Sequence, residues 1–307
     1  MKAAYFMKHG GPEVLEYGDV PAPVASAGEL VVDVHAASVN GADWKVRSGR
    51  YAPITTFPYV PGRDFSGVVS ALGQGASEFA VGDEVFGVCD VGRDGAYAEQ
   101  VAIAAAIVAR KPATLSHVEC AALALTGLTA LVSIEDTLQL KRGETILVQG
   151  GAGGVASFAI QLAKHIGARV ITTASAANHD YLRGLGADQV IDYATQDFTK
   201  LVSGCDAVFD TVGGDVAKRS FEVLRPGGRA AFIASGYVLP PPPRTDVASL
   251  RPNVRRDRAH LERIVALAAS GAVRVPEITT YVLADAAAAH RVSEGRHLKG
   301  KLVFRVR

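Results

Sequence analysis

The sequence predicts an α/β protein in which a β-rich domain is followed by a doubly wound parallel sheet. Its 307 residues exceed what one ordinary hydrophobic core accommodates and suit two domains. Up to about residue 110, short apolar runs are broken by glycine and proline, which is typical of a β domain such as a partly open barrel. After about residue 115, apolar strand-like runs alternate with helical runs, and this alternation indicates a parallel sheet with helices on both faces.

Individual elements follow from the apolar runs and the turn residues between them. Strands are expected in the first part of the chain at 29–38, 66–73 and 83–88, and a helical run at 120–138. The second part is expected to alternate strands at 145–149, 168–175, 189–193, 205–210 and 229–235 with helices at 154–166, 178–185 and 215–224.

The remaining C-terminal elements set the expected domain organisation. Consecutive prolines make residues 239–246 a stiff loop, because proline cannot donate to a strand ladder. A helix at 257–270 and a strand at 299–307 follow, and the strand is expected to return to the first domain. We therefore expect a first domain at 1–115, a second at 116–250, and a segment at 251–307 that completes the second domain and returns to the first.

Composition and charge exclude several classes of function. The formal net charge is +1, and Lys and Arg do not cluster with aromatics, so nucleic acid and membranes are not expected partners. Cys89, Cys120 and Cys205 are far apart and form no C-x-x-C pair, which indicates reduced thiols rather than disulfides or zinc ligands. The sequence shows no signal peptide and no run of about 18 uncharged apolar residues, so we expect a cytoplasmic protein.

Residues 148–164, VQGGAGGVASFAIQLAK, connect a predicted strand to an apolar helix through a glycine-rich turn. Gly151, Gly153 and Ala156 fit the dinucleotide-binding pattern G-x-G-x-x-G/A. One glycine permits a tight turn, another lets the backbone approach a pyrophosphate, and the third position needs only a small side chain where helix meets strand. The start of the helix, near Gly154 and Val155, adds free N–H groups and the positive end of the helix dipole. The stretch therefore predicts a Rossmann-type dinucleotide site.

The end of the next strand indicates which dinucleotide is preferred. Proteins that bind NAD usually carry Asp or Glu there, where the carboxylate binds the ribose hydroxyls. Ser175 stands at this place and offers a hydrogen bond without a charge that would repel a 2′-phosphate. Asn178 and His179 follow and could supply donors, so the sequence favours NADP. Ser175 could also cap a helix, and the two roles are compatible.

The ordered set of motifs resembles the medium-chain dehydrogenase/reductase superfamily, and within it the zinc-free quinone oxidoreductase branch that includes zeta-crystallin. The resemblance covers nearly the whole chain and is carried by segments in family order: AASVNGADWKVRSGRY (36–51), PYVPGRDFSGVV (58–69), VGDEVFG (81–87), GAYAEQ (95–100), ALTGLTA (124–130), the glycine-rich turn, LGADQVIDY (185–193), FDTVGG (209–214), LRPGGR (224–229) and GRHLKGKLVF (295–304). It implies a GroES-like β-barrel domain at 1–115, a Rossmann NADP-binding domain at 116–250, NADPH as the usual cofactor, and a homodimer.

The resemblance also bears on metal binding. The zinc enzymes of this superfamily have a cysteine ligand near the position of Asn40, and Gly-His-Glu where this chain has Gly62-Arg63-Asp64. Without that histidine or a nearby cysteine, a catalytic zinc with three protein ligands is not available. The four-cysteine structural lobe is absent too. We therefore expect an enzyme that uses no metal.

Roles for individual residues are implied in the same way. Asn40 is similar to the family asparagine beside the nicotinamide, and Tyr51 matches a tyrosine at the mouth of the cleft; these two are the candidate catalytic residues. The candidate cofactor-binding residues are Asn40, Thr126, Thr129, Gly151, Gly153, Gly154, Val155, Ser175, Asn178, His179, Tyr193, Val212, Gly213, Ser235 and Lys301. Simpler roles stay open for some of them: Asn40 as a turn residue, Tyr51 as a surface aromatic and Lys301 as a solvated lysine.

The function expected from these observations is an NADPH-dependent oxidoreductase that transfers hydride to quinones or activated alkenes (enones and enals) without zinc. Its partner is a small-molecule quinone or enone, and Asn40, Tyr51 or a water could stabilise the resulting anion or supply its proton. One alternative is a 2-enoyl or alkenal reductase on the same scaffold. Another is an NADPH-binding sensor or structural protein with little turnover.

Overall fold

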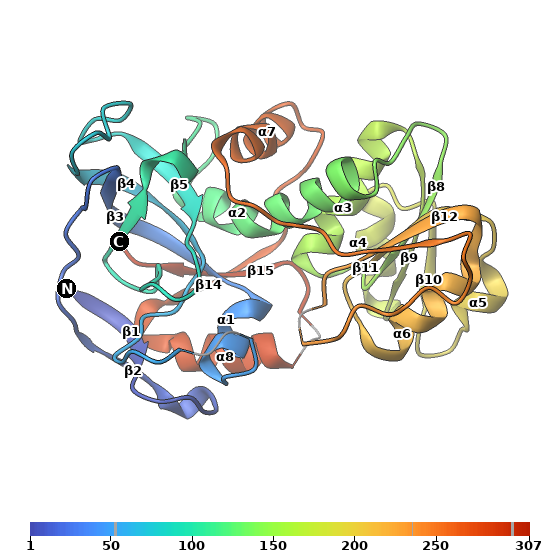
Figure 1. Ribbon diagram of the computed structural model, residues 1–307, viewed down its shortest axis with the longest axis horizontal. Helices are drawn as coiled ribbons and strands as arrows, with labels where there is room; N and C mark the ends of the chain where they lie inside the picture. The colour runs from blue at the N-terminus through green and yellow to red at the C-terminus, as the bar shows by residue number, and fades with distance from the viewer. Residues whose placement is uncertain (52–53, 235, 296–297) are drawn as a thin grey trace. The chain divides into compact units, whose positions relative to one another are not determined.

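A computed structural model describes residues 1–51, 54–234, 236–295 and 298–307 of the chain (Figure 1). By its contacts the chain forms two compact units. The first unit comprises Met1–Leu125, Arg256–Ala269 and Val275–Arg307, and the second comprises Thr126–Arg255 and Ser270–Arg274. The first unit therefore extends beyond the predicted boundary at 115, and most of the segment after 250 groups with it.

The first unit is built mainly from strands. They are β1 (Lys2–Phe6), β2 (Leu15–Asp19), β3 (Glu29–Val39), β4 (Asp64–Leu72), β5 (Glu84–Val88), β6 (Gln100–Ala104), β7 (Val108–Arg110), β14 (Ile278–Val282) and β15 (Lys301–Arg305). Its helices are α1 (Gly41–Arg47), α7 (Arg258–Ala269) and α8 (Ala286–Glu294), with short 3₁₀ turns at Pro12–Val14, Ala105–Ile107 and Leu283–Asp285. β1 and β2 form an antiparallel pair, and β14-β15-β3-β4-β5-β7 form a larger sheet in which β6 also pairs with β3.

β3 is the centre of this sheet. Its sequence, ELVVDVHAASV, is rich in β-branched and small apolar residues, and nearly every side chain is buried. β3 pairs antiparallel with both β4 and β15, so it joins the last strand of the chain to the strands formed by its first part. The C-terminal strand thus pairs with a strand from the start of the chain. This register also positions the polar cluster described below.

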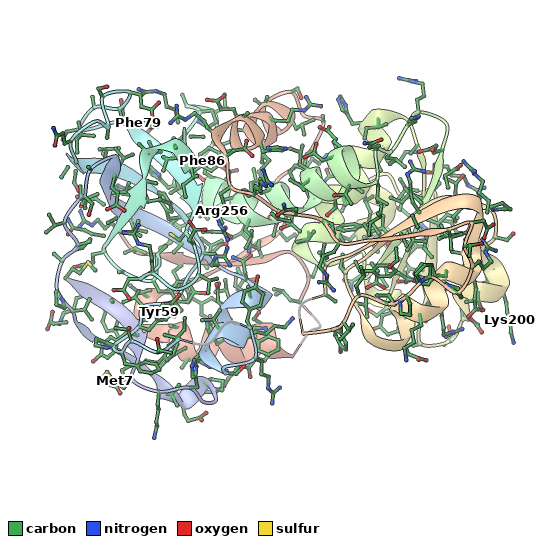
Figure 2. The ribbon with its side chains drawn as sticks, viewed as in Figure 1. Met7, Tyr59, Phe79, Phe86, Lys200 and Arg256 are labelled. Carbon is green, nitrogen blue, oxygen red and sulfur yellow. The ribbon has the colours of Figure 1, made fainter. Side chains whose placement is uncertain are left out.

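α7 joins the first unit through an arginine and an aromatic ring. Arg258 donates to both carboxylate oxygens of Glu78, at 2.7 and 2.8 Å, and to the carbonyl oxygen of Val108 at 2.8 Å. Phe79, labelled in Figure 2, has the guanidinium groups of Arg110 and Arg258 at 5.2 and 5.0 Å from its ring centroid. These contacts explain why a helix that follows the second unit in sequence groups with the first.

The second unit is a doubly wound parallel sheet. Its strands are β8 (Thr145–Gln149), β9 (Arg169–Ala174), β10 (Gln189–Asp192), β11 (Cys205–Asp210), β12 (Leu224–Phe232) and β13 (Ala248–Leu250), and its helices are α3 (Gly154–Ile166), α4 (His179–Gly184), α5 (Phe198–Leu201) and α6 (Gly214–Arg219). Shorter turns lie at Ala176–Asn178 and Ser220–Val223. The strand order is β10-β9-β8-β11-β12-β13 with every pair parallel. The order reverses between β8 and β11, which is the switch point where ligands bind in such sheets.

Most predicted elements of the second unit are confirmed. The strands at 145–149 and 205–210 and the helix at 154–166 have the predicted bounds. The strand predicted at 229–235 was placed too late, because β12 already starts at Leu224, which pairs with Cys205 ahead of a register shift. The helix predicted at 215–224 stops at Arg219 and continues only as a 3₁₀ turn.

The helical run predicted at 120–138 is α2 (His117–Leu131) followed by a π-helical turn at Val132–Thr137. The whole stretch is long and apolar enough to cross a membrane, with a mean hydropathy of 1.6, which the sequence reading did not anticipate. However, 72% of its most apolar window is buried inside the protein. Core helices of soluble proteins share these properties, so the observation is weak evidence for a membrane span.

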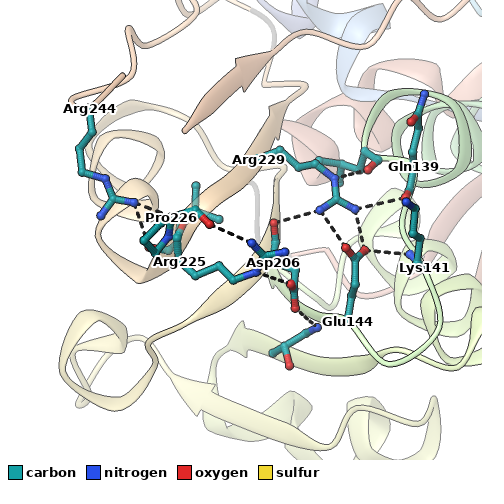
Figure 3. Close-up of polar contacts among 11 residues, drawn as sticks. Gln139, Lys141, Glu144, Asp206, Arg225, Pro226, Arg229 and Arg244 are labelled. Carbon is teal, nitrogen blue, oxygen red and sulfur yellow. Dashed lines mark hydrogen bonds and ion pairs between the residues drawn. The ribbon is translucent and has the colours of Figure 1, made fainter. Parts of the chain in front are cut away.

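A cluster of arginines and acidic residues lies at the end of the parallel sheet where the strands begin (Figure 3). Arg229 on β12 donates to both carboxylate oxygens of Glu144, at 2.6 and 3.1 Å, and to the carbonyl oxygens of Asp206 and Gln139, each at 3.2 Å. Arg225 donates to the carboxylate of Asp206 at 2.6 Å. Gln139 is the one non-glycine residue with a positive φ, +48°, within the described ranges, so Arg229 helps to hold an unfavourable turn. The cluster has a structural role, and the other end of the sheet, where the strands finish, remains for binding.

The three cysteines are free and buried, as the sequence indicated. Burial raises the pKa of Cys89 and of Cys120 to about 12, and that of Cys205 to about 11. Thiols with such pKa values are inert at neutral pH.

Candidate functional site

The turn between β8 and α3 uses its glycines in two different ways. Gly150 has φ +76°, and a Cβ there would lie 2.9 Å from Thr211 Oγ1. A Cβ at Gly151 would lie 2.3 Å from Thr172 Oγ1 on β9. Both positions therefore need glycine because the protein itself packs against them. By contrast, Gly153 has φ −70°, and its Cβ would meet only the Gly150 carbonyl oxygen, at an ordinary 3.7 Å.

Hydrogen bonds from β9 and from the loop after β11 fix this turn. Thr173 Oγ1 accepts from the N–H of Gly150 at 3.1 Å and donates to Gln149 Oε1 at 2.7 Å. The N–H of Gly151 donates to the carbonyl oxygen of Thr173 at 2.9 Å. Thr211 Oγ1 donates to the carbonyl oxygen of Gln149 at 2.8 Å. The backbone of the turn is thus held in place before any ligand arrives.

The start of α3 suits a phosphate group. The helix begins at Gly154 with Gly153 as its N-cap, and no side chain caps it. The N–H groups of Gly154, Val155 and Ala156 have no partner within the helix, and the helix dipole makes this end positive. Ala156 is 1% exposed, so the close approach of helix and strand demands a small side chain there. The open side of Gly153 and these free N–H groups fit the pyrophosphate of a dinucleotide.

A buried carboxylate shapes the loop after β11. Asp210 Oδ1 accepts from the N–H groups of Val212 and Gly213, at 3.0 and 2.6 Å. Its Oδ2 is buried and has no hydrogen-bond partner in the part of the chain that the structure describes. Burial raises the pKa of Asp210 to about 6, against the two backbone N–H groups that lower it. Val212 is 41% exposed, and its Cγ2 would lie 3.0 Å from a Cβ at Gly150, so this loop adjoins the glycine-rich turn.

The end of β9 carries the residues predicted to choose between NADP and NAD. Ser175 occupies the N-cap position of the short turn at Ala176–Asn178, but its side chain makes no capping bond to the backbone. Its Oγ accepts from Asn178 Nδ2 at 3.1 Å. His179 Nε2 is buried and has no hydrogen-bond partner among the described residues. Tyr193, which follows β10, is 54% exposed and donates its N–H to the carbonyl oxygen of Ala174 at 3.4 Å. The structure thus gathers these four residues where β9 and β10 end, next to the turn after β8.

For three of the predicted cofactor-binding residues, the structure gives little evidence about binding. Thr126 is buried in α2, at 4% exposure, and Thr129 lies one helical turn further on, where its carbonyl oxygen accepts from Ser133 Oγ at 2.6 Å. Ser235 lies outside the described residues, so its predicted role is a proposal only.

The first unit holds a buried polar cluster around Asn40. The register of the sheet puts Ser38 opposite Asp64 on β4 and Val39 opposite Leu302 on β15. Asn40, next along the chain, therefore lies between Asp64 and Lys301. Lys301 Nζ donates to Asn40 Oδ1 at 2.6 Å, and Asn40 Nδ2 donates to Asp64 Oδ2 at 2.8 Å. Lys301 is 3% exposed, so the alternative of a solvated lysine is wrong.

A second acidic residue lies beside this cluster. Asp43 Oδ2 accepts from the N–H of Asn40 at 2.8 Å and from the hydroxyl of Tyr97 at 3.0 Å. Its Oδ1 is buried without a hydrogen-bond partner among the described side chains and backbone. Burial raises the pKa of Asp43 to about 6. The capping bond to Asn40 fixes the start of α1 and thereby the backbone of Asn40.

Tyr51 and Arg63 complete the predictions for the first unit. Tyr51 lies beyond the end of α1 and is 48% exposed, so it is accessible to a small molecule. Arg63 is 5% exposed and donates through Nε to the carbonyl oxygen of Cys89 at 2.7 Å. It fills the place of the zinc-binding histidine with a group that cannot ligate a metal. Among the described residues, His, Cys, Asp and Glu form no group of three that could hold a metal ion.

Sequence reasoning missed several residues that shape the site. Asp64 was considered only as a failed metal ligand, and its proximity to Asn40, 24 positions away, left no signal in the sequence. Asp43 and Asp210 carried weak signals, an acid three residues after Asn40 and an acid closing a strand. The threonine that holds the glycine-rich turn, Thr173, carried no signal in the sequence.

Comparison with known proteins agrees with this architecture. A family model described as an alcohol dehydrogenase GroES-like domain matches residues 26–113, and one described as a zinc-binding dehydrogenase matches 185–304. The chain is 35% identical over 272 residues to a 2-methylene-furan-3-one reductase of Solanum lycopersicum, which covers 85% of this chain and 69% of the relative.

Solved structures match over the full length. A quinone oxidoreductase from Coxiella burnetii is 35% identical with a TM-score of 0.93, covering 100% of this chain and 99% of that one. The Escherichia coli quinone oxidoreductase complexed with NADPH is 29% identical with a TM-score of 0.91, covering 100% of both chains. With the parallel sheet, the glycine-rich turn and the substituted metal position, these matches show that the chain belongs to the zinc-free quinone oxidoreductase branch of the medium-chain dehydrogenase/reductase superfamily.

Proposed function

We propose that the protein reduces quinones or activated alkenes with hydride from NADPH and without zinc. The observation that carries this proposal is the turn at the switch point of the parallel sheet, where Gly153 leaves the start of α3 open for a pyrophosphate. The relatives named as quinone oxidoreductases and as a furanone reductase support the choice of acceptor. The expected cytoplasmic location and homodimer stay predictions.

NADPH would supply the hydride, which is chemistry that no side chain of this protein provides. The first turn of α3 would hold the pyrophosphate, and Ser175 would leave room for the 2′-phosphate. Reduction of a quinone or an enone leaves a negative oxygen, which needs a hydrogen-bond donor and then a proton. We assign the donor role to Asn40 and propose Tyr51 or a water as the proton source, since Tyr51 is accessible.

Independence from zinc follows from the residues at the metal position. Arg63 is buried and tied to a backbone carbonyl, and a guanidinium group offers no lone pair to a metal. Asp64 is occupied by Ser38 Oγ at 2.5 Å and by Asn40 Nδ2 at 2.8 Å, both on the same oxygen. Lys301 Nζ lies 3.4 Å from this oxygen of Asp64 and places a positive charge beside it.

A single screen tests both parts of the proposal. Purified protein should oxidise NADPH when offered a panel of quinones, enals and enones, and the activity should survive prolonged dialysis against a chelator. Elemental analysis should find no stoichiometric zinc. NADPH binding without oxidation of NADPH by any acceptor would favour the alternative of a sensor or structural protein. Activity that is lost on chelation and restored by zinc would contradict the metal-free assignment.

Ser175→Asp should shift the preference from NADPH toward NADH. Two like charges about 4 Å apart repel by about 1 kcal/mol in water and about 4 kcal/mol near a protein surface. The affinity for NADPH should therefore fall about tenfold or more, whereas that for NADH should hold or rise. Dissociation constants for both cofactors, measured by fluorescence titration, check this.

Ser175→Asn is the matched control, since it adds similar volume without charge and should leave the preference for NADPH in place. Tighter binding of NADH than of NADPH by the unmodified protein would show that the end of β9 was misassigned.

A further inference from the structure

We propose that Lys301 is a positioning residue that acts through Asn40. Together with Asp64 it fixes the orientation of the Asn40 amide and polarises it, so that the remaining N–H of Asn40 becomes a strong donor to the negative oxygen that develops on the acceptor. The inference rests on the proposed function and assigns to Lys301 a role different from direct contact with the cofactor.

The hydrogen bonds of Lys301 use all three of its N–H donors, so none remains for a ligand. An ammonium group has three N–H donors and no acceptor. Lys301 Nζ has three acceptors around it: Asn40 Oδ1 at 2.6 Å, the Val39 carbonyl oxygen at 2.9 Å and Asp64 Oδ2 at 3.4 Å. Lys301 is also 3% exposed. Any influence of Lys301 on catalysis must therefore pass through these partners.

The orientation of the Asn40 amide is set by the chemistry of its two neighbours. Lys301 can only donate, so the amide atom that faces it must be the oxygen. Asp64 receives hydrogen bonds from Ser38 Oγ at 2.5 Å and from the N–H of Leu125 at 2.9 Å, in the manner of a carboxylate. The amide atom that faces Asp64 must then be the nitrogen, at 2.8 Å. A flipped amide would place a donor against the Lys301 ammonium and an acceptor against the Asp64 carboxylate.

Charge on both sides polarises the amide. A cation at the oxygen and an anion at the nitrogen both favour the resonance form in which the nitrogen is positive, and this strengthens its N–H groups as donors. Burial lowers the pKa of Lys301, and the carboxylates of Asp64 and Asp43 oppose this by favouring the ammonium form. The three acceptors around Nζ match the three N–H donors of that form.

Asn40 retains one donor for a ligand. Its Nδ2 has two N–H groups, of which one is held by Asp64. The only other acceptor in the described chain is the Ser38 carbonyl oxygen, at 3.5 Å, which is the limit for a hydrogen bond. This weakly bonded N–H can donate to the oxygen of a bound quinone or enone instead, because breaking its long bond to Ser38 costs little.

Lys111 provides a matched control elsewhere in the first unit. Its side chain is 7% exposed, pairs with Glu84 at 3.1 Å and donates to the Leu115 carbonyl oxygen at 2.8 Å. Lys111→Met and Lys301→Met therefore both remove a buried, paired ammonium, but only the second touches Asn40.

The kinetic test uses the unmodified protein and both variants with a series of quinones or enones whose reduced anions differ in basicity. Lys301→Met should lower kcat/KM about tenfold to hundredfold, less than the 10²–10³ of deleting an oxyanion donor outright. The loss should grow with the basicity of the anion, and KM for NADPH should stay within about twofold. Lys111→Met should change neither. An equal loss across the series, or the same loss in both variants, would overturn the proposal.

A spectroscopic test does not depend on turnover. In ¹⁵N-labelled protein, the side-chain amide signals of Asn40, identified by their absence in Asn40→Asp, should include one downfield, slowly exchanging proton. Lys301→Met should move both signals upfield, and Lys111→Met should not. If Lys301→Met is unstable because it leaves Asp64 without a counter-ion, the double variant Lys301→Met/Asp64→Asn removes both polarising charges and should move the Asn40 signals upfield at least as far. Unchanged Asn40 signals would refute the inference, even if no acceptor is turned over and the proposed function itself has failed.

Discussion

Gly153→Val is expected to lower the affinity for NADPH at least tenfold, about 1.4 kcal/mol, in a protein that stays folded. The backbone of Gly153 has φ −70°, which valine tolerates, and a Cβ there would meet only one carbonyl oxygen at 3.7 Å. The added side chain therefore costs the free protein little. It would occupy the open space in front of the α3 N-terminus, where a pyrophosphate needs close contact with the backbone. Isothermal titration with NADPH, alongside circular dichroism, measures the effect.

Two neighbouring substitutions separate binding from packing. Ala156→Gly should change NADPH affinity little and cost about 1 kcal/mol of helix stability. Gly151→Val should instead destabilise the second unit, since its Cβ would lie 2.3 Å from Thr172 Oγ1. Normal NADPH binding by Gly153→Val would mean that this turn is not the phosphate cradle, and the proposed function would lose its main support.

Arg47→Met should produce the largest loss of stability, about 3–5 kcal/mol, because it breaks a buried network. Arg47 on α1 is 1% exposed, forms an ion pair with Glu294 on α8, and donates to the Gly10 carbonyl oxygen at 3.1 Å. Its Nη1 also lies 3.1 Å from His290 Nδ1. Since arginine only donates, Nδ1 must be the acceptor and Nε2 carries the hydrogen, which points the imidazole donor at the Tyr97 hydroxyl, 3.4 Å away. Urea denaturation followed by fluorescence measures the change.

Comparison variants show whether the loss comes from the network. Arg183→Met removes an arginine whose ion pair with Asp180 is exposed on both sides, at 59% and 98%, and should leave the denaturation midpoint nearly unchanged. The double variant Arg47→Met/Glu294→Gln should recover part of the loss, because the orphaned carboxylate is removed. A single Arg47→Met variant as stable as the unmodified protein would show that the buried pair contributes no net stability.

The sequence predicted the second unit well because its signals are local. β8 and α3 differ in the spacing of their apolar residues, and the glycines at 150–154 mark the boundary between them. Shorter elements such as α1, α8 and β14 were not predicted, since a few residues carry little periodicity. β12 was placed late because its first residues, LRPGGR, resemble a turn although Leu224 already pairs with Cys205 on β11.

The amino-acid sequence alone reveals the alternation of strands and helices, the glycine-rich turn, and the arginine, Arg63, that stands where a metal-binding histidine would be. The folded structure is needed to see that Gly150 and Gly151 serve packing whereas Gly153 faces open space, because this depends on atoms of β9 and of the loop after β11. It also decided that Lys301 is buried against Asn40, a residue 261 positions away. Such pairs arise from the register of β3 with β4 and β15, and pairing between distant strands leaves no local pattern in the chain.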